Sequence, residues 1–196
     1  QEMYTISGEK MRANYWKEQL DITINGLEEL WCEEEGLYYA SSEADRQLCI
    51  WGSCYAAYTE VCSSKHAKAI SRRIVKDYDK VIRFGQVRHL LFPDVWKKTI
   101  WPKTDDGEIF PKPGIYQNGA YWSTASGWVA AVIRMTDENL ADQMLIDLLE
   151  SFKQTGIYEA INDKPLYMGA KDYCASATLV IQELRRIGIN VGTYGE

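Results

Sequence analysis

Apolar side chains recur at helical spacing in six segments, and no segment alternates apolar and polar residues strongly enough to favour a strand. In the first segment, from about Met11 to Cys32, steps of four, four, three and four residues place one apolar stripe on a helix. Its members are Trp16, Leu20, Ile24, Leu27 and Trp31. Five further helices are predicted over the apolar sets that span Trp51–Val61, Ala67–Val81, Tyr121–Met135, Leu140–Phe152 and Tyr173–Ile187.

Polar and glycine signals mark the ends of two of these helices. Thr136 and Asp137 offer N-cap oxygens to the fifth helix, and Gly188 is a C-cap for the sixth. Helix and loop alternate without a competing strand pattern. The predicted fold is therefore all-α, in a single domain of residues 1–196.

The links between the predicted helices differ greatly in length. Two are short, Cys62–Lys65 and the link between the fourth and fifth helices, whereas three are long, Gly36–Gln47, Arg83–Gln117 and Thr155–Lys171. Short links make antiparallel neighbours, and long links on one rim are where sites are built. The Arg83–Gln117 link holds four of the five prolines, so it is either functional or hides short strands such as Gln86–Leu91.

Charge and composition exclude several classes of protein. The net charge of −6 argues against a nucleic-acid partner, and no apolar run is long enough to span a membrane. A soluble protein is expected, with the choice between cytoplasm and periplasm left open. Five cysteines lack metal-ligand spacing, and Cys54 and Cys62 lie among apolar neighbours, so buried free thiols are favoured over a disulfide.

No metal or cofactor is predicted. His89 has no partner ligand at metal spacing, His66 opens the third helix and is expected to be solvated, and no glycine-rich phosphate loop is present. Seven Trp and thirteen Tyr are many for 196 residues. Aromatic side chains outside the helical stripes either pack loops or offer flat faces to sugar rings.

Three stretches together resemble the carboxy-terminal half of the six-hairpin glycosidases. Ile50-Trp51-Gly52-Ser53 followed by Tyr55 is similar to the opening of an inner helix in that family. Residues 116–122, read YQNGAYW and followed by Gly127-Trp128, resemble its Y-x-N-G-G-x-W rim motif, with Ala120 in place of a glycine. Residues 156–162, read GIYEAIN and followed by Tyr173 and Ser176, resemble its G-x-x-E segment.

The resemblance implies an (α/α)6 toroid whose twelve helices form six hairpins. Six predicted helices make three hairpins, so the chain corresponds to half of such a ring, covering roughly residues 12–188. The remaining half would precede Gln1 in a longer protein or come from a partner, such as a second copy. A half-ring exposes helix faces that a ring buries, and we therefore expect an association surface.

The family likeness also implies a reaction and a substrate. The related enzymes hydrolyse glycosidic bonds in glycans, commonly with inversion, using two carboxyl groups roughly 6.5–9.5 Å apart. Glu159 corresponds to the general base, and apolar surroundings would make its carboxylate a stronger base. The alternative is a solvated or helix-end carboxylate. The general acid of the family would fall before Gln1, and within this chain Asp45, Asp105 and Asp106 are the candidates, the last two reading first as a turn.

Amide and aromatic side chains around these motifs are the candidate sugar ligands. Gln117 and Asn118 can donate to and accept from hydroxyl groups, although Asn118 could instead cap the fourth helix. Trp122 and Trp128 are six residues apart and cannot pack alike, so one is expected in the core and the other on sugar. Tyr116, Trp96 and Trp101 are loop aromatics that either form the floor of a subsite or simply pack. Gln86 and Arg88 are further candidate ligands for sugar hydroxyl groups.

A non-catalytic carbohydrate-binding toroid and a helical interaction scaffold remain the alternatives to a glycosidase. The binding toroid would keep the aromatic and amide side chains without a competent pair of carboxyl groups. The scaffold would use its long loops for partner binding, with tryptophans in the core or the interface. Loss of hydrolysis on Glu159→Gln would single out the enzyme.

Overall fold

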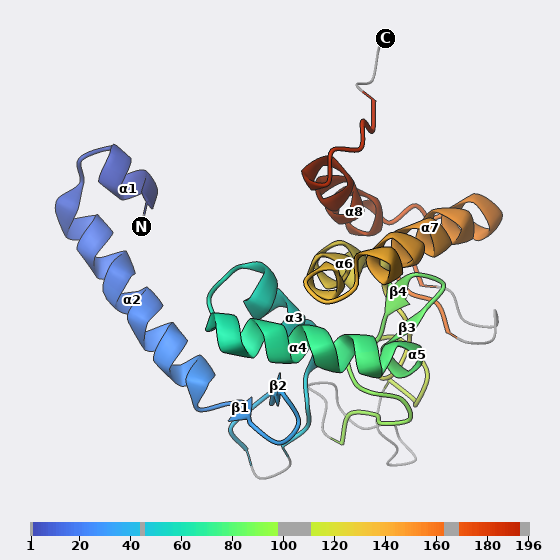
Figure 1. Ribbon diagram of the computed structural model, residues 1–196, viewed down its shortest axis with the longest axis horizontal. Helices are drawn as coiled ribbons and strands as arrows, with labels where there is room; N and C mark the ends of the chain where they lie inside the picture. Colours follow the sequence, from blue (N-terminus) through green and yellow to red (C-terminus); the bar gives the residue numbers. More distant parts are fainter. Residues whose placement is uncertain (1, 44–45, 98–110, 163–168, 193–196) are drawn as a thin grey trace.

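The computed structural model describes residues 2–43, 46–97, 111–162 and 169–192 (Figure 1). Helices dominate these ranges, and the strands are two residues long, so the all-α class is confirmed. The helices are α1 Glu2–Ile6, α2 Lys10–Glu28, α3 Ile50–Tyr58, α4 Ser64–Lys76, α5 Tyr78–Val81, the 3-10 helix η1 Ser123–Ala125, α6 Ser126–Arg134, α7 Glu138–Thr155 and α8 Cys174–Arg186. The strands are β1 Trp31–Cys32, β2 Leu37–Tyr38, β3 Ile82–Arg83 and β4 Gln86–Val87.

The first long helix, α2, ends at Glu28 and not at Cys32 as the apolar stripe predicts. Trp31 leaves the helix because it pairs with Tyr38 in the β1–β2 hairpin and stacks on the His66 ring at 3.8 Å between centroids. His66 is accordingly buried, with Nδ1 3.0 Å from the Tyr38 hydroxyl, so the expectation of a solvated histidine is wrong. A tertiary stacking contact thus overrides the local helical pattern.

Two other predicted helices are shorter than their apolar sets. The helix α3 ends at Tyr58, two residues before Glu60 takes a positive φ of 59°, so Cys62 lies beyond it. The segment Ala67–Val81 is interrupted at Asp77, which ends α4 and ion-pairs with Arg73 and Lys80. The carboxylate of Asp77 therefore lies at the corner between α4 and α5, ion-paired with two basic side chains.

The later helices follow the predictions more closely. Tyr121 lies in extended backbone, and the fourth helix therefore begins with η1 at Ser123 rather than at Tyr121. Asp137 caps α7 as expected, accepting a hydrogen bond from the Leu140 N–H at 2.9 Å. Gly188 follows α8 with a positive φ of 84°, and its N–H donates to the carbonyl of Arg185, as predicted for a C-cap glycine.

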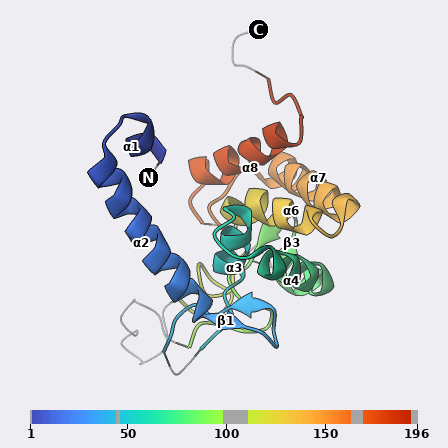
Figure 2. The same cartoon turned by 60° about the vertical axis from the view of Figure 1, so that its left-hand side comes forward.

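Three helices, α3, α6 and α8, run in the same direction along one another. At one end the Ile50 N–H donates to the His89 carbonyl at 2.9 Å, and the Ser176 hydroxyl donates to the Tyr158 carbonyl at 3.0 Å. At the other end Tyr58, Arg134 and Arg186, from the last turns of the three helices or next to them, line one hollow. Because the links before α4 and α7 are short, these two helices return antiparallel and pack on the outside of α3 and α6 (Figures 1 and 2).

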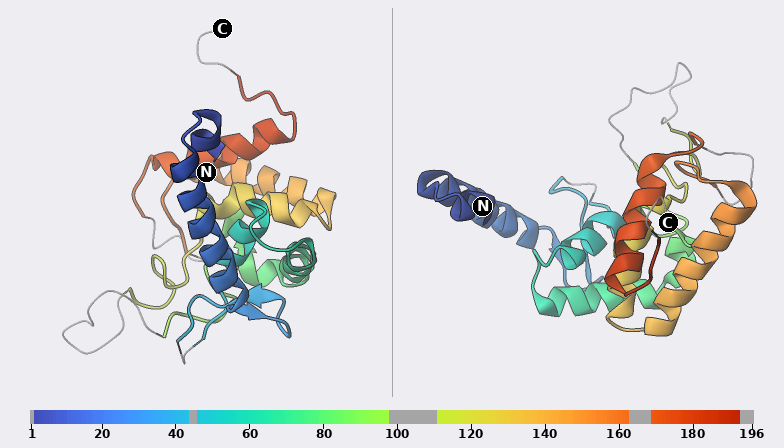
Figure 3. Two further views of the ribbon diagram at one scale, coloured as in Figure 1. Left: turned by 90° about the vertical axis from the view of Figure 1, so that its left-hand side faces the viewer. Right: turned by 90° about the horizontal axis from the view of Figure 1, so that it is seen from above.

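The core lies between this parallel group and the two returning helices. Its buried members include Ile50 and Cys54 of α3, Ile70 of α4, Val129 of α6 and Met144 of α7. In contrast, α1 and α2 project away from the rest of the molecule, as Figure 1 and the top view in Figure 3 show. Within the described ranges, no helix is long and apolar enough to cross a bilayer.

All five cysteines are free, as expected, but their burial is uneven. Cys32 and Cys54 are buried, Cys49 and Cys62 are half-buried, and Cys174 is exposed at the start of α8. Burial raises the pKa of the Cys54 thiol well above its ordinary value. Cys54 therefore behaves as a small apolar core residue.

Gly85 connects β3 to β4 at a point where the hairpin touches α7. Its φ is +68°, and a Cβ there would lie 2.5 Å from both the Met144 carbonyl oxygen and the Leu148 Cβ. The residue must therefore be glycine for steric as well as conformational reasons. Because of this close approach the β3–β4 hairpin, which includes Gln86 and Val87, packs directly on α7.

We predict that Gly85→Ala lowers the free energy of unfolding by about 3 kcal/mol, because it adds overpacking to backbone strain. Gly188→Ala is the matched control, since Gly188 also has a positive φ but a Cβ added to it would meet nothing within 4 Å. The control is expected to lose only about 1 kcal/mol. Urea denaturation followed by circular dichroism measures both values, and equal losses would contradict the packing argument.

Candidate functional site

Three loops meet at the end where α3, η1 and α8 begin. The adjacent residues Tyr121 and Trp122 hold them together by backbone pairing in two directions. Trp122 exchanges hydrogen bonds of 2.9 and 3.0 Å with Val87, while Tyr121 exchanges bonds of 2.7 and 2.9 Å with Ile161. We call this end of the molecule the rim; it comprises residues 86–91, 114–122, 156–162 and 169–173.

Glu159 lies in the rim, held by backbone contacts on both sides. Its N–H donates to the Ala170 carbonyl at 2.8 Å, and the Gly169 N–H donates to the Ala160 carbonyl at 2.7 Å. A Cβ on Gly169 would approach the Glu159 Cβ to 3.0 Å, so the absence of a side chain there makes room for the carboxylate. Backbone hydrogen bonds therefore fix the position of Glu159 although this segment is not helical.

The carboxylate of Glu159 is half-buried and accepts hydrogen bonds from two donors. The Tyr116 hydroxyl donates to Oε1 at 3.3 Å, and the Ala170 N–H lies 3.5 Å from Oε2. Burial, and then the negative charge of Glu159, raises the pKa of the Tyr116 phenol, so the phenol remains a donor. The pair brings together two residues that the sequence motifs place 43 positions apart.

Tyr116 itself is held in a backbone conformation uncommon for a residue with a side chain. Its φ is +50°, and its carbonyl accepts hydrogen bonds from the Ala120 N–H at 3.0 Å and from the Trp122 indole N–H at 3.3 Å. Residues with positive φ often occur at functional sites, where the surrounding contacts maintain the strain. Tyr116 combines this backbone conformation with the hydrogen bond from its hydroxyl to Glu159.

A continuous set of aromatic rings leads from Tyr116 to the helices. Trp122 lies 4.9 Å from Tyr116 between ring centroids and 5.9 Å from Trp51, and Trp51 lies 5.8 Å from Trp128. Trp122 is only 5% exposed, so it supports its neighbours and offers no open face. Trp128 is half-buried and lines a groove between α3 and α8. The two tryptophans thus differ in environment, but not because of helical spacing: Trp122 precedes the helix in extended backbone, whereas Trp128 lies on α6.

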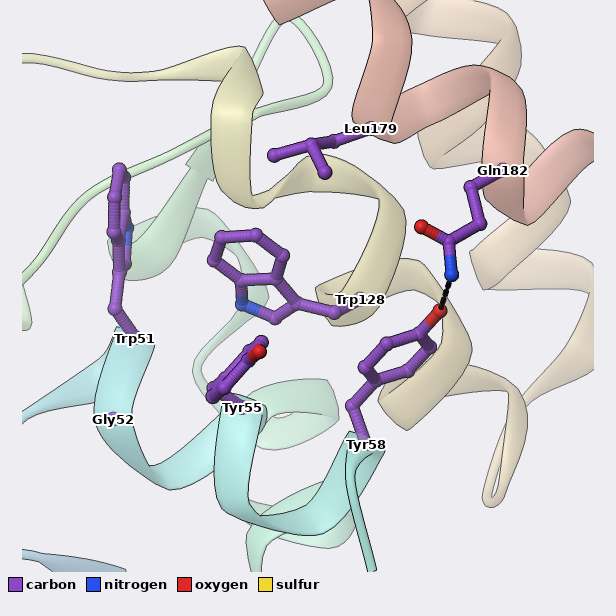
Figure 4. Close-up of a pocket in the computed structure, with 7 residues that line it drawn as sticks. All are labelled: Trp51, Gly52, Tyr55, Tyr58, Trp128, Leu179 and Gln182. Atoms are coloured by element: carbon purple, nitrogen blue, oxygen red, sulfur yellow. Dashed lines mark hydrogen bonds between the residues drawn. The ribbon is translucent and has the colours of Figure 1, made fainter. Parts of the chain in front are cut away.

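The groove beside Trp128 has a volume of about 520 Å³ (Figure 4). Trp51, Gly52, Tyr55 and Tyr58 of α3 form one wall, and Leu179 and Gln182 of α8 form the other. The Gln182 amide donates to the Tyr58 hydroxyl at 3.1 Å, which links the walls. We call these residues, with Trp128, the aromatic groove.

His89 stacks on Trp51, with 3.8 Å between ring centroids. Burial lowers the pKa of its imidazole to about 4, so the ring is neutral near pH 7. In the part of the chain that the structure describes, no hydrogen-bond partner reaches His89 Nδ1, Trp51 Nε1 or Trp128 Nε1, although all three atoms are buried. Unpaired polar atoms of this kind are uncommon in folded proteins.

Asn118 organises the loop and does not cap a helix. Its Oδ1 accepts from the Trp96 N–H at 2.7 Å, and its Nδ2 donates to the Pro111 carbonyl at 2.7 Å, while the residue is 1% exposed. Its amide is therefore occupied inside the protein. The neighbouring Gln117 is exposed and leaves its amide open to solvent. Of the two residues, the geometry favours Gln117 as a contact for an external ligand.

Gln86 and Arg88 are buried on the inner side of the rim. The Arg88 guanidinium donates to the Asp94 carbonyl at 3.0 Å and lies over the rings of Phe92 and Tyr121. Gln86 is 3% exposed, and its Oε1 has no hydrogen-bond partner among the described residues. Both side chains thus lie beneath the surface.

Of the remaining candidate residues, only Trp96 lies within the described part of the chain. The Trp96 side chain is half-buried next to the rim, while Trp101, Asp45, Asp105 and Asp106 lie outside the described residues. Glu159 is thus the carboxylate that the described part of the chain brings to Tyr116. Within the same ranges, no group of three or more His, Cys, Asp or Glu residues could hold a metal ion.

Sequence reasoning misses the roles of Trp51 and His89. Trp51 belongs to a motif, but its stacking on His89 joins residues 38 positions apart across an irregular loop. No periodic pattern connects these positions. A signal for Tyr55 does exist, because it follows Trp51 by one helical turn and therefore shares its face.

Comparisons with protein-family models, with curated proteins and with solved structures found no match for this chain.

We predict that Glu159→Gln lowers the pKa of the Tyr116 phenol toward its ordinary value, because the nearby negative charge is removed. Some elevation should remain, since burial is the larger cause. Titration of ¹³Cζ-labelled tyrosine by NMR measures this pKa, with Tyr116→Phe identifying the resonance. Glu150→Gln, on the exposed face of α7, is the control and should leave the pKa unchanged. If the pKa of Tyr116 is the same in Glu159→Gln as in wild type, the predicted contact between the two side chains is contradicted.

We also predict an acid-dependent loss of stability from His89. With a folded pKa of about 4 and an unfolded pKa of about 6.5, the unfolded chain binds the proton more readily between these values. The contribution of His89 to the free energy of unfolding is therefore fully present above about pH 6.5 and is lost as the pH falls toward 4. At pH 5 the loss is about 2 kcal/mol. Urea unfolding at pH 7.5 and pH 5 should show His89→Phe losing about 2 kcal/mol less than wild type over this interval. Equal losses would contradict the assignment.

Proposed function

We propose that this protein is a glycan-hydrolysing domain of the six-hairpin glycosidase type. The observation that carries the proposal is the hydrogen bond between Tyr116 and Glu159 at an aromatic rim. It joins two of the three stretches that resemble that family, and it supplies a held carboxylate beside aromatic rings. Sugar rings stack on such faces, and their hydroxyl groups bind amides such as that of Gln117.

The proposed arrangement of the helices is part of an α/α toroid. Support comes from the parallel direction of α3, α6 and α8, with α4 and α7 returning on the outside. In this arrangement α3, α6 and α8 are inner helices, and their first turns surround the sugar site at the rim. The tyrosine–glutamate pair then lies where side chains from several inner helices and their preceding loops converge.

In the proposed mechanism Glu159 accepts a proton from the water that attacks the anomeric carbon. The Tyr116 hydroxyl orients one carboxylate oxygen and the Ala170 N–H orients the other, which keeps a second lone pair for the attacking water. A second carboxyl group at inverting distance donates the proton to the leaving oxygen. Asp45, Asp105 and Asp106, or a carboxyl group outside this chain, are the candidates for that role.

The test is hydrolysis of a panel of oligosaccharides by wild type, Glu159→Gln and the control Glu150→Gln. Loss of a general base is expected to lower kcat by about 100-fold or more, while sugar binding, followed by tryptophan fluorescence, persists. Proton NMR of the first product should show inversion at the anomeric carbon. Retained hydrolysis in Glu159→Gln with activity in wild type would reject Glu159 as the base.

Sugar binding without hydrolysis is the second candidate function. One observation favours it: among the described residues, Glu159 is the carboxylate that hydrogen-bonds to the rim tyrosine, and an inverting reaction needs two carboxyl groups. In that case wild type binds a glycan of the panel and hydrolyses none. Tyr116→Phe would then weaken binding without any catalytic effect to measure.

A further inference from the structure

The segment of residues 2–28, comprising α1 and α2 and called the arm below, leaves the body of the protein without covering it (Figures 1 and 3). In the described part of the chain fourteen large apolar side chains are exposed, and seven of them lie on this arm. They are Met3, Ile6, Met11, Tyr15, Trp16, Leu20 and Ile22. Clustered apolar exposure of this kind is typical of an association surface.

The helix α2 carries apolar side chains on two nearly opposite faces. Helical spacing places Trp16 and Leu20 on one face and Met11, Tyr15 and Ile22 on the other. The first face continues to Leu27, which packs on the core, whereas Trp16 is 47% exposed. A helix covered on one side needs one apolar stripe, so two stripes indicate packing on both sides.

The arm is also a weak helix by itself. It contains Gly26 and the β-branched run Ile22-Thr23-Ile24, which lower helix propensity, and helices of this length are marginal in water without tertiary packing. Its charges balance within α2, because Lys10, Arg12 and Lys17 offset Glu18, Asp21 and Glu28. The occupant that covers it therefore needs an apolar surface and no particular charge.

The aromatic groove offers a surface of this chemistry. Its walls and floor contain no charged residue, and Tyr55 is 52% exposed although its ring is flanked by Trp128. The groove lies between two parallel helices, which is the shape that receives a third helix. The same chain thus carries an uncovered apolar helix and an uncovered apolar groove.

We propose that two copies of the chain associate reciprocally, with the arm of each copy in the aromatic groove of the other. Such an interface has two-fold symmetry, and each arm–groove contact occurs twice. One apolar face of α2 then lies on the partner's groove, and the opposite face is free to contact the partner's arm. The inference depends on exposure and shape and is independent of the proposed glycosidase activity.

The exposed surface of the two arms is sufficient for a stable dimer. The seven apolar side chains of each arm are between 39% and 88% exposed, and large side chains at such fractions expose on the order of 100 Å² each. Covering them in both copies would bury on the order of 1,400 Å² before the grooves are counted, which is within the range of specific interfaces. One arm covered alone gives half of that, which is the low range for weak complexes.

The first test is the mass of the full chain in solution, by sedimentation equilibrium and light scattering. Wild type is expected at twice the chain mass. The arm variant Trp16→Glu/Leu20→Glu and the groove variant Tyr55→Glu are each expected at the monomer mass. All three substituted side chains are exposed in the single chain, so circular dichroism should show unchanged helix content. Ile146→Glu, at an exposed apolar position of α7, is the matched control and should remain dimeric.

The second test mixes the arm variant with the groove variant, each carrying a different tag. The mixture retains one intact contact, between the wild-type arm of the groove variant and the wild-type groove of the arm variant. Heterodimers should therefore form, more weakly than wild type, although neither variant dimerises alone. A dimeric groove variant would show that arms pair with arms, and a dimeric arm variant that grooves pair with grooves; either result overturns the proposal. A wild-type chain that is monomeric at its highest soluble concentration overturns it as well.

Discussion

The backbone pairing of Tyr121 and Trp122 is the constraint on which the rest of the rim depends. Two adjacent residues in extended conformation present their hydrogen-bonding groups to opposite sides, so one can pair with Val87 and the other with Ile161. This joins loops that precede or follow different helices. Once they are joined, the Trp122 indole is buried beneath Tyr116 and can support its strained backbone. The position of Glu159 follows from the same pairing through Ala160 and Ile161.

The parallel packing of α3, α6 and α8 gives the molecule two surfaces with different chemistry, one at an end of these helices and one along their sides. The end where these helices begin is closed by loops, carries Glu159 and is rich in aromatic side chains. Along the helices the aromatic groove is apolar and open. Gly127 allows α6 and α8 to approach closely, because a Cβ there would lie 2.6 Å from the Leu179 carbonyl oxygen. The two proposals therefore concern different surfaces, and either can fail without the other.

Trp51 and Trp128 connect these surfaces. Trp51 stacks on His89 at the rim and also lines the aromatic groove, so substitution of Trp51 would disturb both. Tyr55 and Trp16, by contrast, lie on the groove and the arm, away from the Tyr116–Glu159 pair. The pKa of His89 is lowered by burial, and the Tyr116–Glu159 pair does not contribute. Its titration therefore reports on packing around Trp51.

The sequence alone determined the helical class, because apolar spacing is a local property that the chain carries into any environment. It also determined the Asp137 cap, the Gly188 C-cap and the tight connection into α7, since each depends on side chains within four residues. Only the tertiary structure decided where helices stop and which side chains meet. Trp31 leaves its predicted helix to stack on His66, and Asn118 uses its amide inside the loop because Trp96 and Pro111 lie beside it. Tyr116 and Glu159 meet for the same reason: their contact depends on loop pairing across 43 residues, which no local spacing records.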